Sequence, residues 1–287
     1  MKKTLVIGSS VCDVIIRLHR IPQVSRDENI IHQELSIGGC AYNVAHILDN
    51  MHCPYDLFSP VGQGIYGDFV RKHFKEKKIP IMIESQQKNG CCYCLVDDSG
   101  ERTFICEHGA EYFYQASWFD QLDANNYQQV YVCGLEIEED HDEVIIQFLA
   151  SHPHLTIYFA PGPRINAIER KRLMKLLYLH PIVHLNQQEI FEFTKQNDLS
   201  IACASLYQIT QAPIIVTLGK DGCYYYDEKT SFHTPSIKTT VVDTIGAGDS
   251  HIGTIIACRS QDMNWPDCLI KANQIASLVV SQKGSTL

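Results

Sequence analysis

Short apolar runs alternate with segments of helical periodicity along most of the chain. Runs rich in Val, Ile, Leu and Tyr are typical of buried strands, and they occupy residues 4–8, 79–83, 130–134, 156–160, 181–185, 212–219 and 222–226. Apolar residues three or four positions apart indicate helices over 38–51, 67–78, 142–152, 166–180, 188–197 and 245–261. Because strands that alternate with helices form parallel sheets, we predict an α/β fold: a mostly parallel central sheet flanked by helices on both faces.

Two stretches do not follow this alternation. Residues 12–37 and 90–108 have the pattern of strands, and a DDSGE turn interrupts the second stretch. We expect them to form a small antiparallel β lid beside the main sheet, which excludes water from a reaction site. A surface ribbon or an edge that joins two copies of the chain is the alternative. Since no linker or repeat divides the sequence, residues 1–287 are expected to form a single domain.

The composition is that of a globular protein with a sizeable core, with 45% hydrophobic and 20% charged residues. The net charge of -9 argues against a general nucleic-acid-binding protein, which would carry a basic surface. No apolar stretch approaches the length of a membrane span, and the first one, residues 5–7, is too short for a signal peptide. We therefore expect a cytoplasmic protein with no nucleic-acid or membrane partner.

Three of the twelve cysteines gather in the segment GCCYC, at Cys91, Cys92 and Cys94. The interval from Cys91 to Cys94 suits zinc, but a zinc site needs a second pair of ligands at a suitable spacing, which the sequence does not offer. The alternation in CCYCLV favours a strand instead, and a reducing compartment disfavours disulfides.

A glycine-rich turn, DTIGAGD at 243–249, precedes a segment of helical spacing. Such a turn presents backbone N–H groups and the positive end of the helix dipole, an arrangement that binds phosphate oxygens. Asp249 lies within it, where a carboxylate can accept the proton of a hydroxyl group that attacks phosphorus. The N–H groups would then stabilise charge on the transferred phosphoryl group. A helix-capping aspartate without chemistry explains the spacing equally well.

DTIGAGD together with GGCAYN at 38–43, with LNQQE and LGKDG between them, resembles the paired signatures of the ribokinase-like (PfkB) carbohydrate kinases. The resemblance covers essentially the whole chain and is strongest to bacterial sugar kinases of undefined substrate. It implies an ATP-dependent kinase that phosphorylates a hydroxymethyl group of a small sugar or nucleoside. Asp249 would be the general base, and the backbone of Gly246, Ala247 and Gly248 would form the anion hole. The family often forms homodimers through the lid.

Position by position, the resemblance assigns further roles. The acceptor would contact Asp13, Gly38, Gly39, Asn43 and Glu136. The nucleotide would lie against Asn186, Thr217, Gly219, Gly222 and Asn273. Asn186 and Glu189 match an N-x-x-E motif that would organise Mg²⁺ largely through water, as suits a hard cation that retains water ligands. Asp243 and the Ile245 carbonyl match a potassium-type cation site of some members. Relatives usually continue beyond the KGST segment, so an incomplete or differently built cation site is the alternative.

These residues also have purely structural interpretations. Asp13 and Glu136 could be solvated charges at strand ends, Asn186 a loop residue and Asn273 a surface residue. Glu189 could be a favourable charge at a helix N-terminus. His251 stands where the family commonly has an aromatic residue, and its side chain could contact a ligand or only pack.

Two other function classes remain open. GQGIYG at 62–67 has the spacing of a dinucleotide-binding loop, with Glu84 about twenty residues beyond it, which would indicate an NAD(P)-dependent oxidoreductase. Pro60 interrupts the strand that such a loop needs, and that interpretation leaves GGCAYN and DTIGAGD unexplained. The second class is a kinase-fold binding or regulatory protein without turnover. The presence of Asp249, Asn186 and Glu189 argues against it.

Overall fold

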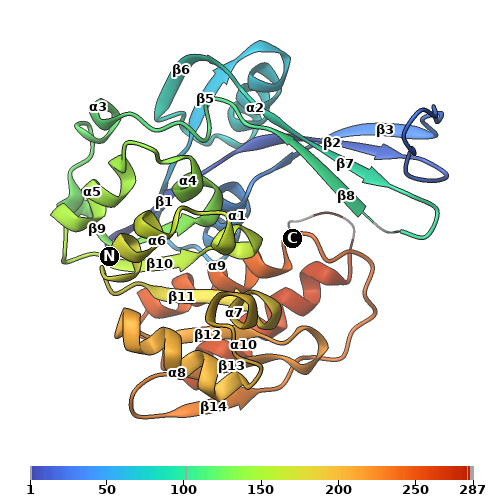
Figure 1. Ribbon diagram of the computed structural model, residues 1–287. Coiled ribbons are helices and arrows are strands. Elements are labelled where there is room, and N and C mark those ends of the chain that lie inside the picture. Colours follow the sequence, from blue (N-terminus) through green and yellow to red (C-terminus); the bar gives the residue numbers. More distant parts are fainter. Residues whose placement is uncertain (1, 101, 283, 285–287) are drawn as a thin grey trace.

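The computed structural model of the chain, which describes residues 2–100, 102–282 and 284, is built around one large sheet (Figure 1). Its eight strands are β1 (Lys3–Ile7), β4 (Tyr55–Phe58), β9 (Tyr127–Cys133), β10 (Thr156–Ala160), β11 (Ile182–Asn186), β12 (Ile214–Thr217), β13 (Cys223–Tyr226) and β14 (Ser231–Thr234). They follow the order β14-β13-β12-β11-β10-β9-β1-β4. All neighbours from β4 to β12 are parallel, whereas β13 and β14 are antiparallel additions at one edge. The expected mostly parallel sheet is confirmed.

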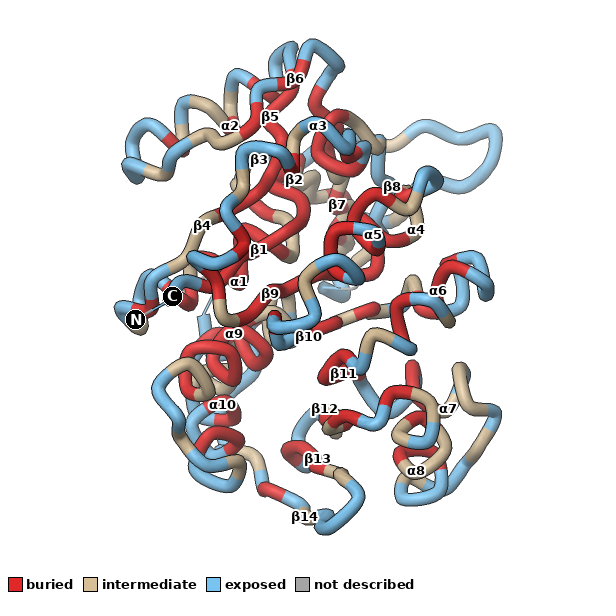
Figure 2. Tube along the Cα trace, turned by 90° about the vertical axis from the view of Figure 1, so that its left-hand side faces the viewer, coloured by how far each residue is buried: buried red, intermediate tan, exposed pale blue. Residues whose placement is uncertain are grey.

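Helices cover both faces of this sheet because its strands are apolar on both sides. Successive side chains of a strand point to opposite faces, and Leu5 and Ile7 of β1 accordingly join one buried cluster while Val6 joins the other. The first cluster includes residues of α3 (Ala116–Phe119), α4 (Gly134–Glu139), α5 (Val144–Ser151), α6 (Arg170–Leu177), α7 (Gln187–Thr194) and α8 (Leu199–Thr210). The second includes residues of α1 (Cys40–Asn50), α2 (Gly64–Lys77), α9 (Ala247–Ser260) and α10 (Trp265–Val280). Figure 2 shows the central strands buried between these layers.

The largest difference from the expected elements concerns residues 79–83. This apolar run is not a strand for most of its length, and β6 (Ile83–Lys88) begins only at its last residue. Pro80 lacks a backbone N–H for a strand ladder, which explains the late start. Strand β6 pairs with β5 (Pro60–Gln63) in a separate two-stranded parallel sheet. Short 3₁₀ turns complete the fold at Ala124–Asn126 (η1), Gly162–Asn166 (η2) and Gly219–Asp221 (η3).

A four-stranded sheet, called the small sheet below, projects from one edge of the molecule (Figure 1). Its strands are β2 (Val11–Arg17), β3 (His32–Gly38), β7 (Cys91–Val96) and β8 (Arg102–Glu107), in the order β3-β2-β7-β8. All four strands come from the two expected stretches, 12–37 and 90–108. Glu101, in the second stretch, lies outside the described residues. The expectation of a wholly antiparallel sheet is wrong, because β2 and β7 are parallel. Each stretch folds as a hairpin, and the long connection through α1 and α2 lets the two hairpins meet in parallel.

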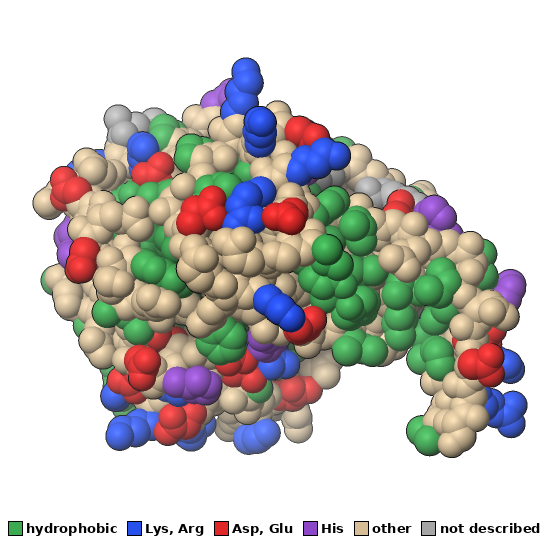
Figure 3. Space-filling model, turned by 90° about the horizontal axis from the view of Figure 1, so that it is seen from above, with side chains coloured by type: hydrophobic (Ala, Val, Ile, Leu, Met, Phe, Trp, Pro, Cys, Tyr) green, Lys and Arg blue, Asp and Glu red, His purple; other side chains and the backbone are tan. Residues whose placement is uncertain are grey.

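The two faces of the small sheet have different neighbours. Residues directly opposite on paired strands share a face, so the register places Asp13, Cys92 and Cys106 in one row on the face that carries Asp13. On the other face, Cys12, Val14 and Cys91 form a buried cluster with Tyr66 and Phe69 of α2. Exposed apolar side chains continue that outer face, and Figure 3, seen from above, shows hydrophobic side chains gathered over this part of the molecule.

Among the residues that the structure describes, no helix combines the length and the apolar character that crossing a membrane requires.

Candidate active site

The glycine-rich turn leads directly into helix α9, as the sequence predicts. Gly246, with φ +74°, caps the helix, and α9 begins at Ala247, so Asp249 lies in its first turn. The first N–H groups of a helix have no partner within the helix and carry its positive dipole end. A Cβ atom added to Gly248 would meet nothing within 4 Å. The Ala247 N–H already donates to the Thr244 carbonyl at 3.3 Å. The N–H groups of Gly248 and Asp249 follow it beside open space, which suits an anionic ligand.

Asp249 is held by a residue from the other sequence signature. The side-chain amide of Asn43, in the first turns of α1, donates a hydrogen bond to Oδ2 of Asp249 at 2.8 Å. Burial raises the pKa of Asp249 to about 6, and the hydrogen bond from Asn43 opposes that rise. Near neutral pH the carboxylate is consequently mostly ionised yet close to its pKa, the condition in which it can accept a proton and release it again.

Asp13 and the glycine pair form the adjoining part of the site. The carboxylate of Asp13 lies over Gly38, where an added Cβ atom would be 2.0 Å from its Oδ2. At Gly39, whose φ is +103°, an added Cβ would be 2.4 Å from the carbonyl oxygen of Ser9. The Gly39 carbonyl accepts the N–H of Asn43 at 2.9 Å. Burial raises the pKa of Asp13 to about 7. A continuous series of contacts thus runs from Asp13 through the glycines and Asn43 to Asp249.

Glu136 lies deeper than the other candidate acceptor ligands. It is fully buried in α4, and its Oε1 accepts a hydrogen bond from the Ser9 N–H at 2.7 Å. Burial raises the pKa of this carboxyl group. In this structure Glu136 supports the connection between β1 and β2 that positions Asp13.

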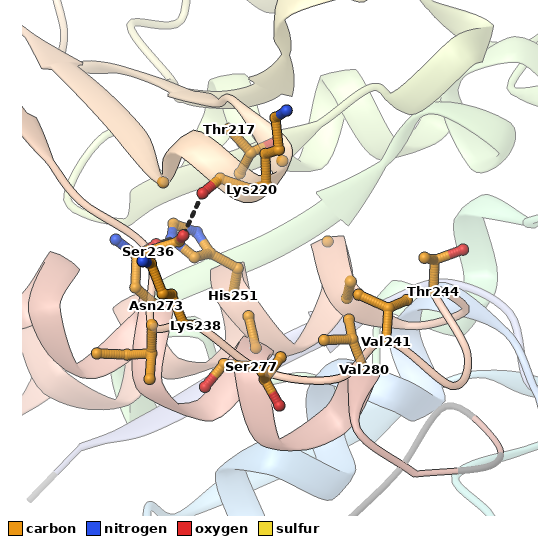
Figure 4. A pocket seen from close by; sticks show the side chains of 17 residues that line it. Thr217, Lys220, Ser236, Lys238, Val241, Thr244, His251, Asn273, Ser277 and Val280 are labelled. Carbon is orange, nitrogen blue, oxygen red and sulfur yellow. Dashed lines mark hydrogen bonds between the residues drawn. The ribbon is translucent and has the colours of Figure 1, made fainter.

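A cavity of about 590 Å³ adjoins the glycine turn between η3, α9 and α10 (Figure 4). Seven residues named in the sequence analysis line this cavity: Thr217, Gly219, Gly222, Ala247, Gly248, His251 and Asn273. Two cations that the analysis missed, Lys220 and Lys238, also line it, as do the apolar side chains of Ile237, Val241 and Val280. Lys220 belongs to the LGKDG segment, so the sequence held a signal for it. A cavity with apolar walls, two ammonium groups and a helix N-terminus at one end suits a nucleotide.

His251 and Asn273 meet in a buried hydrogen-bonded network on one side of this cavity. His184 Nε2 lies 2.9 Å from His251 Nδ1, and His251 Nε2 lies 3.1 Å from Asn273 Oδ1. Burial lowers the pKa of both histidines, that of His251 to about 4, so both rings are neutral. The Asn273 amide nitrogen donates to the carbonyls of Thr234 and Pro235, so its Oδ1 accepts from His251, which in turn accepts from His184. This network fixes the position of the side chains in the cavity wall. No pattern in the sequence pointed to the part played by His184.

Asn186 and Glu189 form a capping box at the N-terminus of α7. Asn186 Oδ1 accepts the Glu189 N–H at 2.9 Å, and the Glu189 carboxylate accepts both the backbone N–H and the side-chain amide of Asn186. Asn186 also pairs in register with Thr217, which lines the cavity. Carboxylate and amide oxygens next to a nucleotide cavity fit Mg²⁺. Because capping hydrogen bonds already engage these oxygens, contact through water suits them better than direct ligation.

Asp243 is engaged in a way that the sequence analysis did not foresee. Its Oδ1 accepts hydrogen bonds from Arg102 Nη1 at 2.6 Å and from the Ile245 N–H at 2.9 Å, and its Oδ2 accepts the Gly284 N–H at 3.1 Å. Burial raises the pKa of Asp243, but the bonds from Arg102 and the backbone outweigh burial and leave that pKa below its usual value. A guanidinium group so close to the carboxylate is incompatible with a potassium ion at the same oxygens. The Asp243 carboxylate therefore does not fit the expected cation site, whereas the role of the Ile245 carbonyl stays a prediction.

The glycines of GQGIYG serve packing. A Cβ at Gly67 would be 2.0 Å from the carbonyl oxygen of Gly62, so the two backbones need close contact. Arg71 pairs with Glu84 at 2.8 Å and also donates to the Gly62 carbonyl. Glu84 is thus part of an ion pair, and the loop joins the two-stranded sheet to α2. These contacts argue against the dinucleotide-binding interpretation.

Comparison with known proteins gives a consistent result. The sequence model described as pfkB family carbohydrate kinase matches residues 1–287. The chain is 31% identical to a protein called uncharacterized sugar kinase YegV from Escherichia coli, over 99% of this chain and 90% of that one. It is 22% identical to a ribokinase from Lactococcus lactis, over 99% and 93% of the two chains. The structure superposes on that of ribokinase from Thermotoga maritima with a TM-score of 0.86 and 18% identity, over 99% and 95% of the two chains. This chain therefore belongs to the pfkB family of carbohydrate kinases, with a ribokinase-like fold.

Proposed function

We propose that the protein transfers the γ-phosphoryl group of ATP to a hydroxymethyl group of a small sugar or nucleoside in the cytoplasm. Family membership makes it a phosphotransferase with an alcohol acceptor. One observation carries the finer proposal: Asp249 directly follows Gly248, which lines the cavity, and its carboxylate accepts the hydrogen bond from Asn43 that ends the Asp13–Asn43 series of contacts. A base in this position would have the nucleotide on one side and the acceptor on the other.

In the proposed reaction, Asp249 accepts the proton of the acceptor hydroxyl group as its oxygen attacks the γ-phosphorus. The bond between that phosphorus and the ADP oxygen breaks, and ADP leaves. Asn43 keeps the carboxylate of Asp249 oriented and largely ionised. The acceptor is oriented by Asp13, by the close backbone of Gly38 and Gly39, and by Asn43, while Glu136 supports this arrangement from below.

The cavity has a positive potential that would stabilise the negative charge on the phosphate groups of a bound nucleotide. Ala247 and Gly248, at the N-terminus of α9, line one end of the cavity, and Lys220 and Lys238 line its walls. Asn186 and Glu189 would hold a magnesium ion through water, and the bound ion would neutralise phosphate charge. Thr217, Gly219, Gly222 and Asn273 would contact the nucleotide.

The names of relatives bear on the acceptor. Similar chains are named ribokinase, fructokinase, deoxyribokinase and nucleoside kinase, and one solved structure is of an Arabidopsis thaliana ribokinase complexed with ribose and ATP. The half-buried acid Asp13 favours an unphosphorylated acceptor, because its carboxylate would repel a sugar phosphate.

The small sheet would act as the lid of this site and join two copies of the chain. Its Asp13 face would be turned toward the acceptor, whereas Leu35 and Ile105 on its outer face are exposed. These two residues lie in one row with Val14 and Tyr93, so they extend a continuous apolar surface.

The test is ADP release from ATP with magnesium across a panel of free sugars and nucleosides. A single acceptor that stimulates ADP release, and is recovered as its phosphate ester, would support the proposal and name the acceptor. ATP binding in calorimetry without turnover on any acceptor would favour a regulatory protein, and no ATP binding at all would refute the kinase proposal.

A further inference from the structure

We propose that Arg102 of the small sheet takes the place of a monovalent cation at Asp243 and positions the catalytic turn, which makes the enzyme independent of potassium. The inference rests on the proposed kinase function. Arg102 is a positioning residue in this account, since it acts on the turn through Asp243 and does not touch the reacting groups.

The ion pair joins two segments that are distant in sequence. Arg102 opens β8, and its guanidinium group meets Oδ1 of Asp243 across 141 positions of the chain at 2.6 Å. The side chains are 23% and 5% exposed, so the pair is shielded from water on the Asp243 side. A carboxylate this deeply buried needs a compensating positive charge, and removing one partner of such a pair is costly.

Asp243 connects this ion pair to the catalytic turn through a hydrogen bond. The same Oδ1 accepts the N–H of Ile245, the residue before Gly246, and so fixes the backbone that enters α9. The N–H groups of Val242 and Asp243 donate to the Val280 carbonyl at the end of α10, which anchors the turn from behind. The position of the small sheet and the direction of the N–H groups near Asp249 are thereby coupled.

The donors that the described residues bring to the Asp243 carboxylate disfavour a second cation there. Three donors already engage the Asp243 carboxylate, one of them a guanidinium group with a full positive charge. A potassium ion bound to the same oxygens would have to displace that group or lie against a like charge. The register also turns Arg102 to the same face as Asp13, since Arg102 is opposite Val96 and Val96 is opposite Arg17. The guanidinium group therefore faces the site from within the small sheet.

The experiment compares chloride salts of potassium, sodium and tetramethylammonium at equal ionic strength, with melting temperature and turnover both measured. For the wild type we expect both quantities to be the same in all three salts. Arg102→Ala leaves Asp243 without its partner, so we expect a fall in kcat of about tenfold or more in tetramethylammonium, from misplacement of the turn. Potassium or millimolar guanidinium chloride should restore much of that kcat and raise the melting temperature of this variant alone.

Two further variants keep the result interpretable. Arg102→Lys retains a positive charge, so its kcat and melting temperature should not depend on potassium. This variant tests the proposal even if Arg102→Ala folds poorly. Arg17→Ala removes the same charge from the same face of the small sheet without touching Asp243, and should match the wild type in every salt. A potassium-dependent melting temperature of the wild type, or an Arg102→Ala variant indifferent to potassium and guanidinium, would overturn the proposal. The melting-temperature results need no acceptor, so they stand even where the kinase proposal fails for lack of turnover.

Discussion

The side-chain amide of Asn43 donates a hydrogen bond to the carboxylate of Asp249 at 2.8 Å, across 206 positions of the chain. This contact joins the two sequence signatures, one on α1 and one on α9, into a single site. The contact also opposes the effect of burial on the pKa of Asp249, because a donor to the carboxylate favours the ionised form over the neutral one.

Removal of this donor should change the pH dependence of the reaction. Burial raises the pKa of Asp249 to about 6 and Asn43 opposes the rise, so the kcat/KM of the wild type should fall as the pH drops through about 6. Asn43→Ala should move this acidic limb to higher pH. Asn50→Ala, at the exposed end of the same helix, should leave the limb in place. Superimposable profiles of the wild type and Asn43→Ala would contradict the role of the contact.

Asp249→Asn should stabilise the fold at neutral and alkaline pH. The folded pKa of about 6 lies above the unfolded value, so the folded protein binds this proton more tightly, and stability declines as the pH rises from about 4 to about 6. Asparagine does not ionise and avoids this loss. We expect the melting temperature to rise by about 5 °C near pH 8 and by little near pH 4. As a control, Asp262→Asn at an exposed position should not change the melting temperature differently at the two pH values. If Asp249→Asn raises the melting temperature equally at pH 8 and pH 4, the raised pKa of Asp249 is wrong.

Gly38→Ala should weaken acceptor binding while the fold is kept. The new Cβ would lie 2.0 Å from Oδ2 of Asp13 and push that carboxylate aside. Loss of its hydrogen bonds should raise the acceptor KM by about tenfold or more, with little change in the KM for ATP. In an Asp13→Ala background the same substitution should add little, because its target is gone. If the effects of the two substitutions on the acceptor KM are fully additive, Gly38 does not act through Asp13.

Two neighbouring residues of β8 provide a test of the proposed dimer. Phe104 and Ile105 are 53% and 56% exposed but point to opposite faces of the small sheet. Ile105→Lys should shift sedimentation toward the monomer, because the charge lies on the outer apolar face. Phe104→Lys lies on the Asp13 face and should alter acceptor kinetics without changing the sedimentation. Identical sedimentation of the wild type and Ile105→Lys would rule out this surface as the interface.

The parts of the molecule that follow from local sequence were predictable, and those that need distant contacts were not. The central strands and the turn at 243–249 have patterns set by neighbouring residues. The capping box of Asn186 and Glu189 is equally local. By contrast, the partnership of Arg102 with Asp243 and that of His184 with His251 join residues 141 and 67 positions apart. The parallel pairing of β2 with β7 depends in the same way on how the intervening helices pack.

The most direct test of the central claim is turnover by Asp249→Asn under saturating ATP, magnesium and acceptor, with binding of both substrates measured by calorimetry on the same preparation. Asparagine can still accept the hydrogen bond from Asn43, but it cannot take a proton. The account predicts unchanged binding and a kcat lower by a factor of about a hundred or more. A kcat equal to that of the wild type, at titrated active-site concentration, would show that Asp249 is not the base.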